Sequence, residues 1–163
     1  KKIFAYITGY GTTCDGVDRI KPNIDGKQLA RALRMALDDA GYAPRDIDYI
    51  SLDAAATREG DISEVAAIKE VFGDRAQDIP VSAPKTMFGN LLGASGAVDL
   101  VITMMAMEHN LIPPTLNLKN IDPPCAGLKF VRDKAQECSI RRALVISRGR
   151  AGINAVLAIE KAA

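Results

Sequence analysis

The sequence lacks an excess of charge of either sign. Its 163 residues include 21 basic and 20 acidic residues, a formal net charge of +1, and no long run of one sign interrupts the mixture. Binding to nucleic acid or to an anionic membrane surface normally requires a basic patch or stripe. The composition therefore predicts neither partner.

Cysteine is scarce, with only Cys14, Cys125 and Cys138 in the chain. An odd number without CxxC spacing indicates neither a disulfide framework nor a zinc site, and no other metal or cofactor motif stands out. A reducing cytoplasm is the expected location. The N-terminus lacks the long apolar run and cleavage site of a signal peptide. Because it also lacks a Met and begins inside an expected strand, we expect a piece of a longer protein.

Long apolar runs are absent except in one stretch, Met87 to Met107, which is about as long as a bilayer requires. Three glycines, Asn90, Ser95 and Asp99 interrupt it, and polar groups of this kind are unfavourable in a membrane. We expect instead a central helix of a globular domain. Asp99 is its only charge between residues 97 and 107, which predicts burial on most faces.

Around this helix, the chain alternates strands and helices within a single expected domain, 1–163. Capping boxes at Asp25 and Gln28 and at Asp61 and Glu64 predict two helix starts, and Gly41 and Gly73 the two ends. Gly9 and Gly11 indicate a bulge or a close backbone approach in the first strand. The expected strands are 3–12, 48–53, 80–83, 128–131 and an antiparallel pair, 142–147 and 154–160; 112–118 is extended. This order is typical of an α/β layered fold.

Two segments resemble a known family. Residues 85–99 read KTMFGNLLGASGAVD and residues 112–118 read IPPTLNL. They are similar to the KSxxGHxxGAAGxxE…IPPTxNL segment of the β-ketoacyl synthases, the condensing enzymes of fatty-acid and polyketide assembly. The resemblance implies the C-terminal half of a thiolase-like fold, a mixed sheet with a buried central helix that forms αβαβα layers when complete.

The resemblance also implies a site, which departs from the family pattern at both histidines. Asn90 occupies one histidine position, and Asp53, in DAAAT, occupies the histidine of the family's HGTST segment. An ionised Asp accepts hydrogen bonds and cannot donate one to an oxyanion, and Asn cannot shuttle a proton. The family's nucleophilic cysteine lies in the other half of the fold, and none of the three cysteines here has a comparable context. The single histidine, His109, is expected to complement the dipole of the central helix.

Four further positions belong to this expected site. Lys85 and Glu64 match the family's lysine and acidic residue, and we expect Lys85 to pair with a carboxylate and Glu64 to cap its helix. The terminal turn reads SRGRAGINA where the family has SFGFGGHNA, so Arg148 and Arg150 replace two aromatic residues of an acyl gate. We expect an arginine, first Arg148, to lie within hydrogen-bond or salt-bridge reach of Asp53.

Together these departures resemble one branch, the chain-length factors, or β-subunits, of type II polyketide ketosynthases. That branch has DAA in place of HGT, APKTM before a glycine and an ARGRxGxN-like turn. The resemblance implies a non-catalytic subunit that pairs with a catalytic α-subunit, or a homodimer, and that works with acyl carrier protein.

Three alternatives remain open. The first is an active β-ketoacyl synthase that performs decarboxylative condensation with unusual site residues. The second is a thiolase-like acyltransferase, indicated by GNLLGASG but lacking that family's histidine and CxGGG motif. The third is a domain inside a multimodular synthase, either inactive or merely structural. The residue at the nucleophile position, outside this sequence, would separate them.

Overall fold

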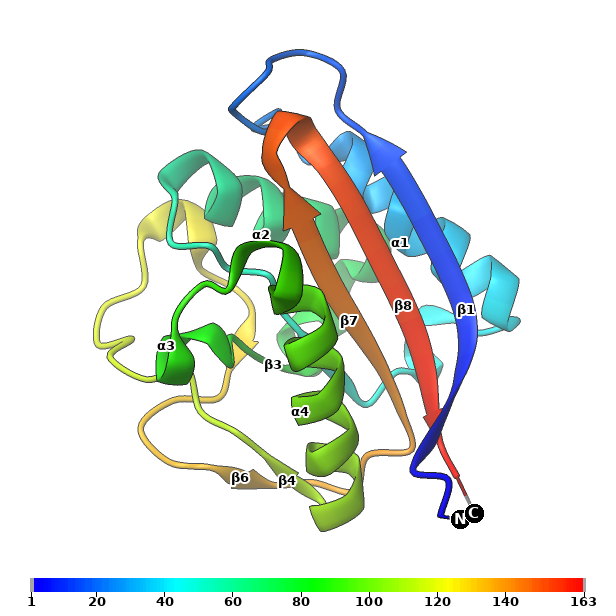
Figure 1. The fold of residues 1–163 in the computed structure, drawn as a ribbon. Helices are drawn as coiled ribbons and strands as arrows, with labels where there is room; N and C mark the ends of the chain where they lie inside the picture. The colour runs from blue at the N-terminus through cyan, green and yellow to red at the C-terminus, as the bar shows by residue number, and fades with distance from the viewer. Residues whose placement is uncertain (1, 163) are drawn as a thin grey trace.

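A six-stranded sheet with helices on both faces forms the body of the molecule in the computed structural model, which describes residues 2–162 (Figure 1). The strand order is β1-β8-β7-β2-β3-β5. Neighbouring strands β1, β8 and β7 run antiparallel, whereas β7, β2, β3 and β5 run parallel. The strands are β1 Ala5–Cys14, β2 Tyr49–Ser51, β3 Pro80–Ser82, β5 Lys129–Phe130, β7 Arg142–Gly149 and β8 Ile153–Lys161. The expected mixed α/β fold is confirmed.

The helices divide the core into two parts. Helices α1 (Lys27–Ala40) and α2 (Arg58–Phe72) cover one face of the sheet, and α4 (Ser95–His109) lies on the other (Figure 1). The larger core cluster includes Leu33 and Ile68 from the first pair, while Met107 of α4 belongs to a smaller cluster on the opposite face. A short helix, α3 (Lys85–Phe88), precedes α4, and a two-stranded ribbon, β4 (Leu111–Ile112) with β6 (Gln136–Glu137), follows it.

The glycines of β1 allow α1 to pack directly on the strand. A Cβ added to Gly9 would lie 2.3 Å from the carbonyl oxygen of Ala36, and one added to Gly11 would lie 2.1 Å from that of Ala32. The pairing register with β8 also shifts between Ile7 and Gly9, which marks a bulge. The expected bulge and close backbone approach are therefore both confirmed.

Neither predicted capping box forms. Helix α1 begins after Gly26, which has a left-handed backbone, and Asp25 accepts a hydrogen bond from the Lys27 amide instead of capping the helix. Helix α2 begins at Arg58, three residues before the expected start, because Thr57 is extended and its carbonyl already accepts from the Asp61 amide. Both helices are present where the capping patterns predicted them, but each begins at a different residue from the one predicted.

The central helix is shorter than predicted. Gly89, Asn90 and Leu91 separate α3 from a 3-10 turn at Leu92–Ala94, and α4 starts only at Ser95. Leu92 has a φ of +54°, which an α-helix does not accommodate. The prediction of burial on most faces is also wrong for this chain, since Val101 and Met105 are 51% and 44% exposed. The buried positions of α4 include the polar residues Ser95, Asp99 and Thr103.

Candidate functional site

The candidate site forms where parallel strands end side by side. Strands β2, β3 and β7 are neighbours, and their carboxyl ends meet at one edge of the sheet. Asp53 follows β2, Lys85 follows β3, and Arg148 is near the end of β7. This edge is the usual place for ligands in open α/β sheets. Asp99 reaches the same place from α4, so four elements contribute to one cluster of charges.

Lys85 is the cation at the centre of the cluster. Its Nζ lies 3.1 Å from Asp53 Oδ1 and 2.6 Å from Asp99 Oδ2, and all three side chains are buried. Burial lowers the pKa of Lys85, but the negative charges of Asp53 and Asp99 outweigh burial and leave it raised. Burial raises the pKa of Asp99 despite the Lys85 contact. The expectation that Lys85 pairs with a carboxylate is confirmed, and it pairs with two.

Arg148 contacts Asp53 through its main chain. The Arg148 amide donates to Asp53 Oδ1 over 3.0 Å, so the expected hydrogen-bond contact is confirmed, but the positive partner of Asp53 is Lys85. The guanidinium turns away: Nε donates to Asn154 Oδ1, and Nη1 donates to Gly60 O and Ser63 Oγ, each over 2.9 Å. Arg148 therefore ties the β7–β8 turn to the first two turns of α2. Arg150, the second arginine of the turn, is exposed.

Glu64 holds the loop that follows Asp53. Its two carboxylate oxygens accept from the Asp53 amide at 2.8 Å and the Ala54 amide at 2.9 Å. The expectation that Glu64 caps its own helix is wrong, because its side chain reaches the preceding loop from the second turn of α2. Burial, followed by the charge of Asp53, raises the pKa of Glu64 to about 7.

Asn90 is not part of the charge cluster. It lies exposed in the break between α3 and α4, where its Oδ1 accepts from the Leu92 amide at 2.9 Å and from Ser95 Oγ at 3.1 Å. An Asn in this role organises its own loop. The two positions that the family resemblance assigns to histidines thus differ: Asp53 is buried and ion-paired, whereas Asn90 faces outward in the described part of the chain.

Strained backbone at the site is a feature that the sequence analysis missed. Ala54 and Ala56, in the loop after Asp53, have φ of +37° and +58°, and Ala151 in the β7–β8 turn has φ of +61°. Alanine rarely adopts these values, and such strain concentrates at functional sites. The signal was present, because the HGTST and SFGFGGHNA patterns have glycine where this chain has Ala54 and Ala151.

The remaining candidate groups lie apart from the cluster. Cys14 is exposed, and burial raises the pKa of the Cys125 and Cys138 thiols, which disfavours the reactive thiolate. His109 is in the last turn of α4, where its expected place near the helix end is confirmed. Between residues 2 and 162, no group of three or more His, Cys, Asp or Glu could hold a metal ion, and no helix is long and apolar enough to cross a membrane.

Polar atoms at the site could accept hydrogen bonds but offer few donors. Asp53 and Glu64 present carboxylate oxygens that already accept from Lys85 and from main-chain amides. Stabilising an oxyanion instead requires preorganised donors directed at the developing charge. As arranged in residues 2–162, the cluster is suited to holding the strand ends and loops in place.

Known proteins of similar sequence point to one family. The family described as "Beta-ketoacyl synthase, C-terminal domain" matches residues 4–119. The 3-oxoacyl-[acyl-carrier-protein] synthase 2 of Staphylococcus aureus (strain COL) is 38% identical over 159 residues, 98% of this chain, and that of Synechocystis sp. is 39% identical over 160 residues. The chain spans 38% of the length of both relatives.

Solved structures agree. A type II polyketide ketosynthase, in complex with its acyl-carrier protein and bound to the hexaketide, superposes with a TM-score of 0.95 at 32% identity, over 99% of this chain and 39% of that one. The ishigamide ketosynthase/chain length factor gives 0.93 at 38% identity, again over 99% and 39%. The chain belongs to the beta-ketoacyl synthase family and corresponds to its C-terminal, thiolase-like domain.

Proposed function

We propose that the protein is a non-catalytic subunit of the chain-length-factor type, which supports acyl-chain condensation by a catalytic ketosynthase in fatty-acid or polyketide biosynthesis. The observation that carries this proposal is the state of Asp53. Its Oδ1 accepts from both Lys85 and the Arg148 amide in a buried cluster. The position at which the family has a catalytic histidine is therefore occupied by an acceptor whose Oδ1 already holds two donors.

A catalytic site at this place would need an open donor directed at the oxyanion, whereas the Lys85 ammonium is held between Asp53 and Asp99. Removing one oxyanion donor typically costs a factor of about 10²–10³ in rate. Asp53 would add repulsion of the developing negative charge, and the Asn90 side chain is engaged in its own loop. An active synthase with these residues would have to stabilise the oxyanion without either histidine of the family pattern.

The β7–β8 turn supports the same proposal. In the family resemblance this turn carries the aromatic acyl gate, whereas here the Arg148 guanidinium binds Asn154, Gly60 and Ser63. A turn fixed to α2 by these hydrogen bonds resists the displacement that admits an acyl chain. The proposal is therefore of a retained scaffold that lacks the aromatic gate.

The proposed partners are a catalytic sibling ketosynthase and an acyl carrier protein. Among the similar structures are a ketosynthase complexed with its acyl-carrier protein and a ketosynthase/chain length factor. We propose the corresponding heterodimer for the full-length protein, in the cytoplasm, with a homodimer as the alternative assembly.

Co-expression tests the proposal. The full-length protein should copurify with a sibling that retains Cys-His-His, and chain extension from malonyl thioester should require the sibling. Replacing both Asp53 and Asn90 by His should restore little activity, because Arg148 still fixes the turn. Robust chain extension by the protein alone would contradict the partner role, and activity undiminished by Lys85→Ala and Asn90→Ala would favour an unconventional enzyme.

A further inference from the structure

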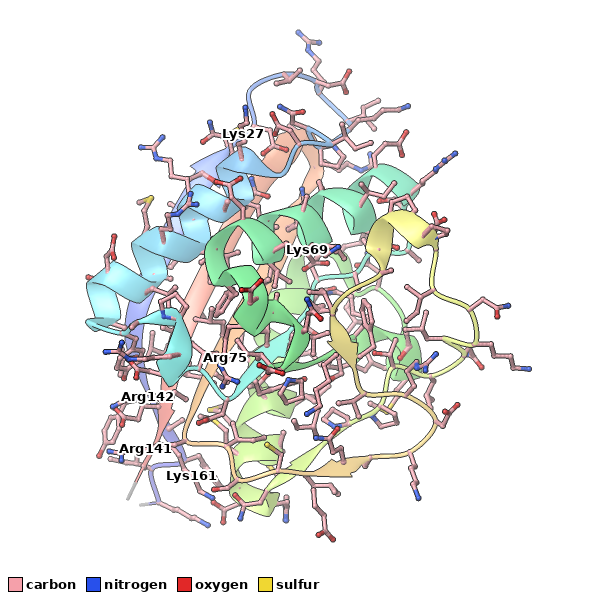
Figure 2. All side chains as sticks on the ribbon, turned by 180° about the vertical axis from the view of Figure 1, so that it is seen from behind. Lys27, Lys69, Arg75, Arg141, Arg142 and Lys161 are labelled. Atoms are coloured by element: carbon pink, nitrogen blue, oxygen red, sulfur yellow. The ribbon has the colours of Figure 1, made fainter. Side chains whose placement is uncertain are left out.

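A cavity of about 330 Å³ lies beside the charge cluster but is distinct from it. It is bounded by the end of β2, the first turns of α2 and the loop from 115 to 125, and its lining excludes Asp53, Lys85 and Asn90. In Figure 2 the yellow Pro123–Cys125 segment lies against α2 on this side of the molecule, and the two are in contact. Small-molecule sites usually have volumes of about 300–1,000 Å³, and an engineered apolar cavity of about 150 Å³ already holds benzene.

Hydrogen bonds fix one wall of the cavity to the sheet. Thr115 Oγ1 accepts from the Ala83 amide at 3.0 Å, and the Thr115 amide donates to the Val131 carbonyl at 2.8 Å. Thr86 Oγ1 donates to the Ala83 carbonyl at 2.8 Å and accepts from the Leu116 amide at 3.0 Å. A ligand would therefore meet a wall that is already ordered, which lowers the entropic cost of binding.

The cavity presents mostly apolar side chains. Leu52 and Val65 of the buried core line it, together with the half-buried side chains of Leu118, Ile121 and Phe130. Contact with an apolar ligand would remove the half-buried side chains from water, which is favourable.

The polar groups of the lining offer a ligand few open partners. Both Glu64 oxygens accept from main-chain amides, and the two threonine hydroxyls hold the wall. Asp61 Oδ1 has almost no accessible surface. Asn117, Asn120 and Asp122 are exposed, so water solvates their side chains. A polar ligand would lose its hydration here with little compensation, which favours an apolar one.

The charges of the lining disfavour an ionised ligand. Its charged residues are all acidic, Asp61, Glu64 and Asp122, and no Lys or Arg of residues 2–162 lines the cavity. Lys69, labelled in Figure 2, packs over Gly127 and also stays outside the lining. An anion would be repelled. A cation would lose its hydration beside carboxylates that already accept from the chain or face solvent, so the cavity favours a neutral ligand.

Phe130 and Cys125 favour an aromatic ligand among the neutral ones. Aromatic pairs gain free energy beyond the area that they bury, and Phe130 offers a partly exposed ring. Burial raises the pKa of the Cys125 thiol, so the sulfur stays neutral and acts as a small apolar group.

We propose that the cavity binds a neutral aromatic compound of one or two fused rings, packed against Leu118, Ile121 and Phe130. Such a compound matches the cavity in volume, in its apolar walls and in the lack of a cationic partner among residues 2–162. Binding here does not require that the protein condense acyl chains or pair with a ketosynthase.

Ligand-detected NMR titration of the full-length protein with indole tests the proposal. We expect a dissociation constant of about 1 mM or lower. Indole-3-acetate, which adds a carboxylate to the same ring, should bind about tenfold more weakly or worse, because it places a negative charge beside the acidic lining. Tryptamine, which adds an ammonium group, should bind no more tightly than indole. Asp122→Asn should leave indole binding unchanged and strengthen indole-3-acetate binding by about threefold.

Two cavity-filling variants, Ile121→Trp and Leu118→Trp, test the location of the site without altering charge. Each should weaken indole binding by about tenfold or more, because the new side chain occupies the space of the ligand. Ile20→Trp, the matched change at an exposed residue outside the lining, should leave indole binding unchanged. Thermal unfolding midpoints establish that each variant is folded.

The proposal is overturned if indole does not bind, if indole-3-acetate or tryptamine binds more tightly than indole, or if a folded cavity-filling variant binds indole normally. Failure of these tests would leave the proposed subunit role untouched.

Discussion

The two faces of α4 differ in the opposite sense from an ordinary amphipathic helix. Ser95, Asp99 and Thr103, four residues apart, face inward and are at most 3% exposed, whereas Val101 and Met105 are about half exposed on the outward side. The inward face is polar because Asp99 binds Lys85 and Thr103 Oγ1 donates to the Asp99 carbonyl. Burial in the first half of α4 therefore follows the charge cluster, whereas Ala106 and Met107 near its end belong to the hydrophobic core.

Removing the Lys85 ammonium, which pairs with the inward face of α4, should lower the free energy of unfolding more than any other change considered. Lys85→Met leaves Asp53 and Asp99 buried without a positive partner, and loss of one member of a buried ion pair destabilises by about 3–5 kcal/mol. Denaturant unfolding measures the change. Lys119→Met, at an exposed lysine, is the matched control and should change the unfolding free energy by less than about 0.5 kcal/mol. Equal effects of the two variants would mean that the cluster does not stabilise the fold.

Glu64 should make the same region sensitive to pH. Its pKa is raised from 4.5 to about 7 in the folded protein, so the folded state holds this proton more tightly than the unfolded state. The resulting stabilisation is present below pH 4.5 and is lost as pH rises to 7. Between pH 4 and pH 8, wild type should lose about 3 kcal/mol of unfolding free energy relative to Glu64→Gln. Unfolding curves for both proteins at several pH values measure this difference, and parallel pH profiles would refute the assignment.

The two arginines of the β7–β8 turn allow the same comparison, because the Arg148 guanidinium is hydrogen-bonded to α2 whereas Arg150 is exposed. Arg148→Met removes the guanidinium bonds to Asn154, Gly60 and Ser63 and should cost about 2 kcal/mol, since hydrogen bonds to charged groups contribute about 1.5–3 kcal/mol. Arg150→Met, at an exposed position, should change stability by less than about 0.5 kcal/mol. Both are measured by denaturant unfolding, and an Arg150 effect as large as that of Arg148 would contradict the role given to the guanidinium.

Substitutions on the outward face of α4 should have the smallest effect on the free energy of unfolding and the largest effect on self-association. Val101→Gln with Met105→Gln should change the unfolding free energy of the 163-residue chain by only about 0.5 kcal/mol, because both side chains are already half exposed. Exposed apolar patches usually mark an interface. We therefore expect the unmodified 163-residue chain to self-associate in sedimentation experiments and the double variant to do so less. A stable monomer of the unmodified chain at high concentration would contradict this expectation.

Local patterns predicted much of the fold. The order of strands and helices, the end of α1 at Gly41 and the close approach at Gly9 and Gly11 follow from periodicity and from where only glycine fits. The break before α4 did not follow, because Leu92 gives no warning that its backbone is left-handed. It accompanies local hydrogen bonds from the Leu91 amide to Ser95 Oγ and from the Leu92 amide to Asn90 Oδ1, and hydrophobic spacing does not reveal these contacts.

The candidate site was predictable in its residues but not in its contacts. The family resemblance brought together Asp53, Lys85, Glu64 and Arg148, and the structure places them around one edge of the sheet. The spacing of residues could not predict which donor pairs with which acceptor. Arg148 can donate from its main-chain amide or from its guanidinium, and Asp53 receives the amide. Glu64 accepts from a loop that precedes its own helix. Asp99 was noted only as the single charge of an apolar helix, although a lone buried carboxylate requires a cation, and Lys85 supplies it.

Decarboxylation of a malonyl thioester by the full-length protein alone is the most direct test of the proposed loss of catalysis. This half-reaction requires donors for the developing enolate oxygen but not the growing chain, so it isolates the consequence of Asp53 and Asn90. We predict a rate indistinguishable from that of the buffer and unchanged by Asn90→Ala. Decarboxylation well above the buffer rate that Asn90→Ala abolishes would show that this site still stabilises the oxyanion and would contradict the account.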